Sequence, residues 1–279
     1  MAPKFDPAMA KKKLEKSPKK PARSRKSQPA TVSATMGLDV GANRLAGRVA
    51  LVTGGNRGLG LAFAKALAAQ GCDVVVTGRD EAQLGLAGSE LAKLGAHVLT
   101  HHCDVRDERS VTLLLQAIRE QFGHIDILIN NAGIAHSAKN IEELSLKEWR
   151  DTVDTNLTGM FLVTRSALPL IVPGGAIVNN LSVAAKTVFP GMAAYNASKF
   201  GAMGFTKALR AELQPRGIRV IALMPGATDT DIWLQFWPSA PRKKMLHTST
   251  IANALVSALM LPEEASVNEL LIAPTAGAL

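Results

Sequence analysis

Short apolar runs alternate with longer amphipathic segments from about residue 48 to the end of the chain. The runs, rich in β-branched residues, predict seven strands over residues 48–53, 73–77, 96–100, 125–130, 175–181, 217–223 and 268–273. Apolar residues at helical spacing predict six helices between them, near residues 58–70, 80–94, 107–122, 145–171, 193–215 and 248–260. Almost wholly apolar strands are typical of a parallel sheet covered on both faces. The pattern therefore predicts an α/β fold with one doubly wound, seven-stranded parallel sheet flanked by helices.

The first 44 residues do not follow this alternation. They are rich in Lys, Pro, Ser and Ala, and large apolar side chains occur there only singly. Such a segment buries too little apolar surface to offset the conformational entropy lost on folding. We therefore expect a disordered basic tail over residues 1–44 and one folded domain over residues 45–279.

The positive charge of the chain is concentrated in this tail. The formal net charge is +9, and residues 1–44 contribute eleven basic and three acidic side chains to it. The remaining chain is close to neutral, so its charge does not indicate a nucleic-acid-binding domain. A solvated extension is the favoured interpretation of the tail. The alternatives are nuclear import and nucleic-acid contact through its lysine runs.

Composition argues against several other classes of protein. The chain has 47% hydrophobic residues, enough for a sizeable core, but no run of 18 uncharged apolar residues. We therefore expect no membrane span, no secretory signal and a cytoplasmic location. Prolines in the tail oppose the amphipathic helix of a transit peptide. No metal site is expected, because Cys72 and Cys103 lack ligand spacing and the neighbouring His101 and His102 bring no further ligands.

A glycine-rich turn follows the first predicted strand directly and leads into an Ala-rich helix. The turn reads Thr53-Gly54-Gly55-Asn56-Arg57-Gly58-Leu59-Gly60. Glycine lets backbone N–H groups approach a pyrophosphate, and the helix N-terminus favours negative charge. This is the context of a Rossmann-type dinucleotide site, with a turn that holds no ligand as the alternative. We expect the cofactor to contact Gly54, Asn56, Arg57, Gly58, Leu59 and Gly60.

The end of the second predicted strand indicates which dinucleotide is bound. NAD-binding folds place a carboxylate there to bind the ribose 2′-hydroxyl, whereas this chain has Gly78 and Arg79. Arg79 and Arg57 together could hold a 2′-phosphate between two guanidinium groups. Asp80 is better placed as the N-cap of the following helix. The charges favour NADP(H), with NAD(H) as the alternative.

The single tyrosine of the chain, Tyr195, lies four residues before Lys199. This spacing puts both side chains on one helix face. The pKa of an isolated phenol is near 10, and an adjacent ammonium lowers it toward the range useful in acid–base catalysis. Ser182 follows the fifth predicted strand, at the edge where open parallel sheets bind ligands. Its hydroxyl could bind the same carbonyl oxygen as the phenol. A tyrosine that merely covers the core, with a solvated lysine, is the alternative for the pair.

With these motifs the chain resembles the short-chain dehydrogenase/reductase family over residues 45 to 275. Further motifs in family order carry the resemblance: Asp104-Val105, Asn130-Asn131-Ala132-Gly133, Thr155-Asn156-Leu157, Tyr195-Asn196-Ala197-Ser198-Lys199 and Pro225-Gly226 with Thr230. The resemblance implies Tyr195 as general acid and base, Lys199 as the group that lowers its pKa and holds the nicotinamide ribose, Ser182 as the residue that orients the carbonyl, and Asn156 as the residue that positions a relay water.

The resemblance also implies the remaining cofactor contacts. Asp104 and Val105 would lie at the adenine, and Asn131, Ala132 and Gly133 beside the adenosine ribose. The nicotinamide carboxamide would meet the turn that contains Pro225, Gly226, Thr228 and Thr230. Relatives pair their long helices. We expect small or apolar positions such as Gly201, Ala202 and Phe205 to be exposed on these helices, which predicts a homo-oligomer, a dimer or a tetramer.

The sequence departs from its relatives at three places. Asn179-Asn180-Leu181 precedes Ser182 where many relatives have a second serine, and Met224 replaces a frequent asparagine. By the same resemblance, residues 231–247 would cover the substrate. This segment is short, which favours a small apolar ketone or aldehyde over a steroid; an interface or core segment is the alternative. The leading hypothesis is an NADP(H)-dependent oxidoreductase acting on a carbonyl or alcohol. The rival is a non-catalytic NADP(H)-sensing protein whose basic tail contacts nucleic acid.

Overall fold

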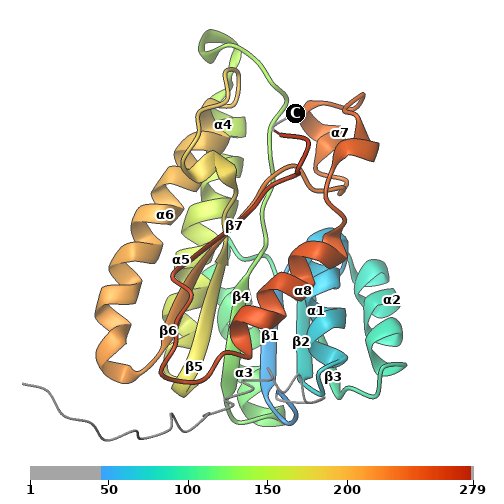
Figure 1. Ribbon diagram of the computed structural model, residues 1–279, viewed down its shortest axis with the longest axis vertical. Helices are drawn as coiled ribbons and strands as arrows, with labels where there is room; N and C mark the ends of the chain where they lie inside the picture. The colour runs from blue at the N-terminus through green and yellow to red at the C-terminus, as the bar shows by residue number, and fades with distance from the viewer. Residues whose placement is uncertain (1–44, 278–279) are drawn as a thin grey trace, which may run out of the picture. The chain divides into compact units, whose positions relative to one another are not determined.

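A computed structural model describes residues 45–277, and in it the sheet is parallel and seven-stranded (Figure 1). The strand order is β3-β2-β1-β4-β5-β6-β7. The strands are β1 (Val49–Thr53), β2 (Asp73–Gly78), β3 (Val98–His102), β4 (Ile125–Asn130), β5 (Ile171–Asn180), β6 (Arg219–Pro225) and β7 (Glu269–Ile272). The predicted doubly wound α/β fold is confirmed.

Helices cover both faces of this sheet. They are α1 (Gly58–Ala68), α2 (Glu81–Ala92), α3 (Glu108–Gln121), α4 (Leu146–Val153), α5 (Gly159–Ala167), α6 (Ala193–Leu213), α7 (Trp233–Phe236) and α8 (Thr248–Leu259). One core cluster joins the sheet to α1, α2 and α8, and a second joins the opposite face to α3, α5 and α6. Since alternate side chains of each central strand enter opposite clusters, both faces must be apolar, which explains the nearly continuous apolar runs.

Several predicted boundaries were wrong. β5 begins at Ile171, not at 175, because the strand continues through Pro173 and the left-handed Gly174 (φ 78°), where its register with β4 shifts. β3 (Val98–His102) and β6 (Arg219–Pro225) each lie two residues later than predicted. The single helix predicted over 145–171 is divided by a π-helical turn, η2 (Asp154–Thr158), which separates α4 from α5. Single π turns of this kind are frequent at functional sites.

The strand order reverses beside β1, and this reversal locates the site. β1 pairs with β2 on one side and with β4 on the other, so Leu51 faces both Val75 and Leu128 in register. The connections that leave β1 and β4 run to opposite faces of the sheet. A crevice therefore opens at the carboxyl ends of these two strands, as is general for open α/β sheets.

Some expectations concern residues that the structure does not describe. The predicted disordered tail over residues 1–44, and any nucleic-acid contact through it, lie outside the described residues. Within residues 45–277, no helix is long and apolar enough to cross a bilayer. The same residues contain no group of three or more His, Cys, Asp or Glu side chains that could hold a metal ion.

Candidate active site

One cleft of 1220 Å³ lies at the carboxyl end of the sheet and brings the predicted site residues together. Every residue expected to bind the cofactor lines it, from the turn after β1, the ends of β2, β3 and β4, helix α6 and the turn after β6. Ser182, Tyr195 and Lys199 line it as well. Asn156 does not, so the structure separates it from the other predicted catalytic residues.

The glycine turn after β1 requires glycine at several of its positions. Gly54 and Gly58 have left-handed backbones, with φ of 61° and 53°. A Cβ at Gly60 would lie 2.1 Å from the Gly54 carbonyl oxygen and 2.5 Å from Asn131 Nδ2. The first turn of α1 carries no acidic residue, so its N–H groups face the cleft without a competing negative charge. The turn fits a diphosphate group.

Asn131 ties this turn to the end of β4. Its Nδ2 donates to the carbonyl oxygens of Thr53 (2.9 Å) and Gly54 (3.1 Å). In return, the Thr53 hydroxyl accepts the backbone N–H groups of Asn131 (2.9 Å) and Ala132 (3.0 Å). The two chain segments that border the crevice are therefore held together by four hydrogen bonds.

The far end of the cleft has two arginines, and the carboxylates near the ends of β2 and β3 are engaged in hydrogen bonds. Arg57 and Arg79 are both exposed at the cleft. Asp80 is the N-cap of α2, as predicted, because its carboxylate accepts the N–H of Gln83 at 3.0 Å. Asp104 is held by Arg106, whose side-chain hydrogen bonds lower the pKa of that carboxyl. A 2′-phosphate would meet positive charge here.

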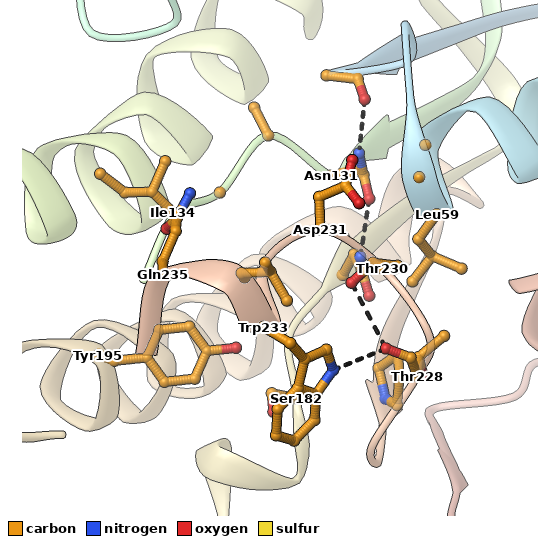
Figure 2. A pocket seen from close by; sticks show the side chains of 18 of the residues that line it. Leu59, Asn131, Ile134, Ser182, Tyr195, Thr228, Thr230, Asp231, Trp233 and Gln235 are labelled. Atoms are coloured by element: carbon orange, nitrogen blue, oxygen red, sulfur yellow. Dashed lines mark hydrogen bonds between the residues drawn. The ribbon is translucent and has the colours of Figure 1, made fainter. Parts of the chain in front are cut away.

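Tyr195 and Lys199 project from one face of α6, one helical turn apart, as the spacing predicts. Figure 2 shows the Tyr195 hydroxyl pointing into the cleft, toward Ser182. Lys199 is buried, its Nζ lies 5.6 Å from the centre of the tyrosine ring, and it donates to the Asn180 carbonyl oxygen at 3.0 Å. Ser182 follows β5 and also accepts the N–H of Ala184 at 3.1 Å.

The pKa of Tyr195 is raised, whereas the sequence predicted that it would be lowered. Burial raises the pKa of Tyr195, and this effect exceeds the opposing effect of the hydrogen bond with Ser182. Burial also lowers the pKa of Lys199 to about 8. Without ligands, desolvation therefore favours the neutral form of both groups, and the nearby ammonium does not make the phenol more acidic than usual. The sequence gives the spacing of the pair but not its burial.

Asn156 lies behind the cleft, in the π turn η2. Its side chain accepts the N–H of Ile134 (2.8 Å) and donates to the Ile134 carbonyl oxygen (2.9 Å) and the Ser198 hydroxyl (3.0 Å). Ser198 in turn donates to the Tyr195 carbonyl oxygen at 2.7 Å. The amide thus braces the loop after β4 against the helix that carries Tyr195. These bonds occupy the side-chain amide, and the positioning of a relay water by Asn156 stays a prediction.

Part of the segment predicted to cover the substrate lines the cleft, namely residues 231–235 and Trp237. Thr228 donates its hydroxyl to the Gly226 carbonyl oxygen (3.0 Å), and its own carbonyl oxygen accepts the indole N–H of Trp233 (2.8 Å; Figure 2). Gln235 of α7 accepts the N–H of Ala135 at 3.1 Å, which fastens this segment to the loop after β4. Sequence reasoning missed Gln235, since a neutral amide outside a motif gives no signal, and it noted Asn180 only within a departure from the family pattern.

Comparisons with known proteins agree with this geometry. The sequence profile described as short chain dehydrogenase matches residues 48–239. A D-threitol dehydrogenase from Mycolicibacterium smegmatis is 40% identical over 220 residues, 75% of this chain and 82% of that protein. A 3beta-hydroxysteroid dehydrogenase from Mediterraneibacter gnavus is 38% identical over 186 residues, 66% of this chain and 67% of that protein. A solved short chain dehydrogenase from Burkholderia cenocepacia in complex with NADP is 35% identical, with a TM-score of 0.77 over 84% of this chain and 99% of that one.

Gly60→Ala tests the packing of the turn. The added Cβ would meet backbone atoms that cannot rotate away. We expect the free energy of unfolding to fall by about 1–3 kcal/mol, as for other overpacked sites. Urea denaturation followed by circular dichroism measures it. Gly85→Ala is the matched control, because nothing lies within 4 Å of that position in α2. An equally stable Gly60→Ala protein would contradict the close approach.

Proposed function

The chain belongs to the short-chain dehydrogenase family, and we propose that it transfers hydride between NADP(H) and a carbonyl or alcohol substrate. One observation carries the proposal: Ser182, Tyr195 and Lys199 line the same cleft as a glycine turn at the N-terminus of α1. The turn can hold a diphosphate, and the three side chains can bind the substrate oxygen and donate or accept its proton.

The nicotinamide group supplies or accepts the hydride when the cofactor is bound. In the reductive direction Tyr195 donates its phenolic proton to the carbonyl oxygen, and the Ser182 hydroxyl orients that oxygen. Lys199, held by the Asn180 carbonyl, binds the nicotinamide ribose and places an ammonium near the phenol. The raised pKa of Tyr195 in the ligand-free protein keeps the phenol protonated, which suits a general acid.

The charges around the far end of the cleft support a preference for NADP(H). Arg57 and Arg79 are exposed there, while Asp80 is used as a helix N-cap and Asp104 is held by Arg106. The carboxylate nearest the end of β2, Asp80, is engaged through Oδ1 as the N-cap of α2. NAD(H) would forgo the contact with both guanidinium groups.

The substrate end of the cleft supports a neutral, apolar ketone or aldehyde. Its lining includes Ile134, Met192, Trp233, Leu234 and Trp237. The basic residues among the described lining are Arg57, Arg79 and Lys199, and none of them is left at this end to bind an acid group of the substrate. Burial of apolar substrate surface against the two indoles would supply the binding free energy.

We also propose that the chain forms a homo-oligomer through α5 and α6. Phe161 of α5 and Phe200 of α6 are 40% and 43% exposed. Two of the positions expected to be exposed are not: Ala202 is fully buried, and Phe205 packs partly against the core and edge-to-face on Phe161 at 6.3 Å. Phe161 and Phe200 therefore replace these two positions as the apolar surface that a second copy would cover.

Tyr195→Phe tests the assigned acid. Phenylalanine preserves the shape and removes the proton, so kcat/KM for ketone reduction should fall about 10²–10⁴-fold. A fluorescence titration with NADPH is the control, since the cofactor should still bind. Activity within about tenfold of the wild type would rule out this role for Tyr195.

Arg79→Asp tests cofactor selection. An aspartate at the end of β2 can accept the 2′-hydroxyl and repels a 2′-phosphate, so the ratio of kcat/KM values should shift toward NADH by about 10²-fold. Arg119→Asp makes the same charge change on α3, away from the cleft, and should leave the ratio unchanged. A native enzyme that uses both cofactors equally would contradict the guanidinium contact.

Phe200→Glu tests the oligomer surface. A charge at the centre of an apolar contact should reduce the molar mass seen by light scattering after gel filtration. Leu86→Glu on α2, which is 61% exposed on the other face of the sheet, is the control. A mass that stays constant in Phe200→Glu would exclude this face as the interface.

A further inference from the structure

Two consecutive asparagines end β5, and their side chains have different surroundings. Asn179 is fully buried: its Oδ1 accepts Asn130 Nδ2 at 2.8 Å, and its Nδ2 donates to the Thr206 hydroxyl at 2.9 Å. Successive side chains of a strand point to opposite faces. Asn180 lines the cleft instead, and its Oδ1 is buried without a partner in the described structure.

Asn180 is the middle link of a hydrogen-bonded path between the glycine turn and the catalytic lysine. Its Nδ2 donates to Asn131 Oδ1 at 2.9 Å. Asn131 is fixed at its other end, because its Nδ2 donates to the Thr53 and Gly54 carbonyl oxygens. The Asn180 carbonyl oxygen accepts Lys199 Nζ at 3.0 Å. A shift of the turn would therefore reach Lys199 through two amide side chains and one backbone carbonyl.

The orphaned oxygen argues against a purely structural role. A buried acceptor without a partner costs about 1–3 kcal/mol, whereas the fully bonded Asn179 carries no such cost. An apolar residue could occupy the same position in the strand without this free-energy cost. Such a destabilising group is retained when the rest of its side chain serves the site.

We propose that Asn180 is a positioning residue that fixes the Lys199 ammonium relative to the glycine turn. The inference rests on the proposed hydride-transfer function, in which Lys199 must contact the nicotinamide ribose while the turn holds the diphosphate. One side chain then sets the position of the nicotinamide-ribose contact relative to the diphosphate contact. The amide acts through Asn131 and Lys199 and does not itself touch the reacting atoms.

The surroundings of Lys199 make a change in its pKa easy to interpret. Burial lowers the pKa of Lys199 to about 8, with no carboxylate contributing to this shift. The ends of β4 and β5 contribute the neutral amides of Asn131 and Asn180. The remaining ionisable groups of the described cleft lining are Tyr195 on α6, Asp231 after β6, and, around the glycine turn and the ends of β2 and β3, Arg57, Arg79, Asp80, Cys103 and Asp104.

The test compares Asn180→Ser with the matched variant Asn179→Ser, one position earlier in the strand. Asn180→Ser breaks the link to Asn131, so we expect kcat to fall about ten- to a hundredfold because Lys199 is misplaced, with Tm near the wild-type value. The NADPH Kd, measured by fluorescence without turnover, should rise in parallel. Asn179→Ser loses fully buried hydrogen bonds and should lower Tm, with kcat, Kd and the pH profile unchanged.

Asn180→Asp adds a readout that a structural role would not move. A carboxylate beside Lys199 favours the ammonium, so the lysine pKa seen in the pH dependence of the NADPH Kd should rise by about one unit or more. The proposal is overturned if Asn180→Ser lowers Tm as Asn179→Ser does while kcat and Kd stay at wild-type values. It is also overturned if the lysine pKa seen in the pH dependence of the NADPH Kd is the same in Asn180→Asp as in the wild type. Failure of the hydride-transfer function would be seen separately, as an active Tyr195→Phe enzyme.

Discussion

The site depends on the contact between the glycine turn after β1 and Asn131 at the end of β4. Gly60 approaches the Gly54 carbonyl so closely that no Cβ fits, and Asn131 holds that same carbonyl. This contact keeps the crevice between two diverging connections at a fixed width. The N-terminus of α1, the cleft wall and, through Asn180, the Lys199 ammonium are all placed relative to it.

Burial decides the electrostatics of Tyr195 and Lys199. Tyr195 and Lys199 both have pKa values shifted toward their neutral forms, because the cleft withdraws both from water and no carboxylate compensates. A neutral phenol can donate a proton, and a lysine with a pKa of about 8 responds to small changes in its surroundings. The braces behind the pair, Asn156 with Ser198 and Asn180 with Asn131, hold these groups by neutral hydrogen bonds and add no charge.

Predictions failed where a local signal competed with a tertiary one. Pro173 and Gly174 look like a loop, yet β5 continues through them because pairing with β4 resumes after a shift in register. The 145–171 segment has a continuous helical pattern, and the π turn within it is stabilised by contacts of Asn156 with Ile134 and Ser198, far along the chain. Ala202 of α6 was expected on the surface, but it is buried in the hydrophobic core.

The sequence by itself determined the strands, the parallel sheet, the glycine turn, the NADP-type strand end and the Tyr195–Lys199 spacing, because each depends on periodicity or on residues close in the chain. Only the tertiary structure decided that the phenol is buried, that Asn156 bonds both Ile134 and Ser198, that Gln235 fastens the segment after β6 to the loop after β4 and that Asn180 links two distant parts of the site. These properties arise from contacts between residues many positions apart. Desolvation and long-range hydrogen bonds are set by the packing of the whole domain, and no local pattern encodes them.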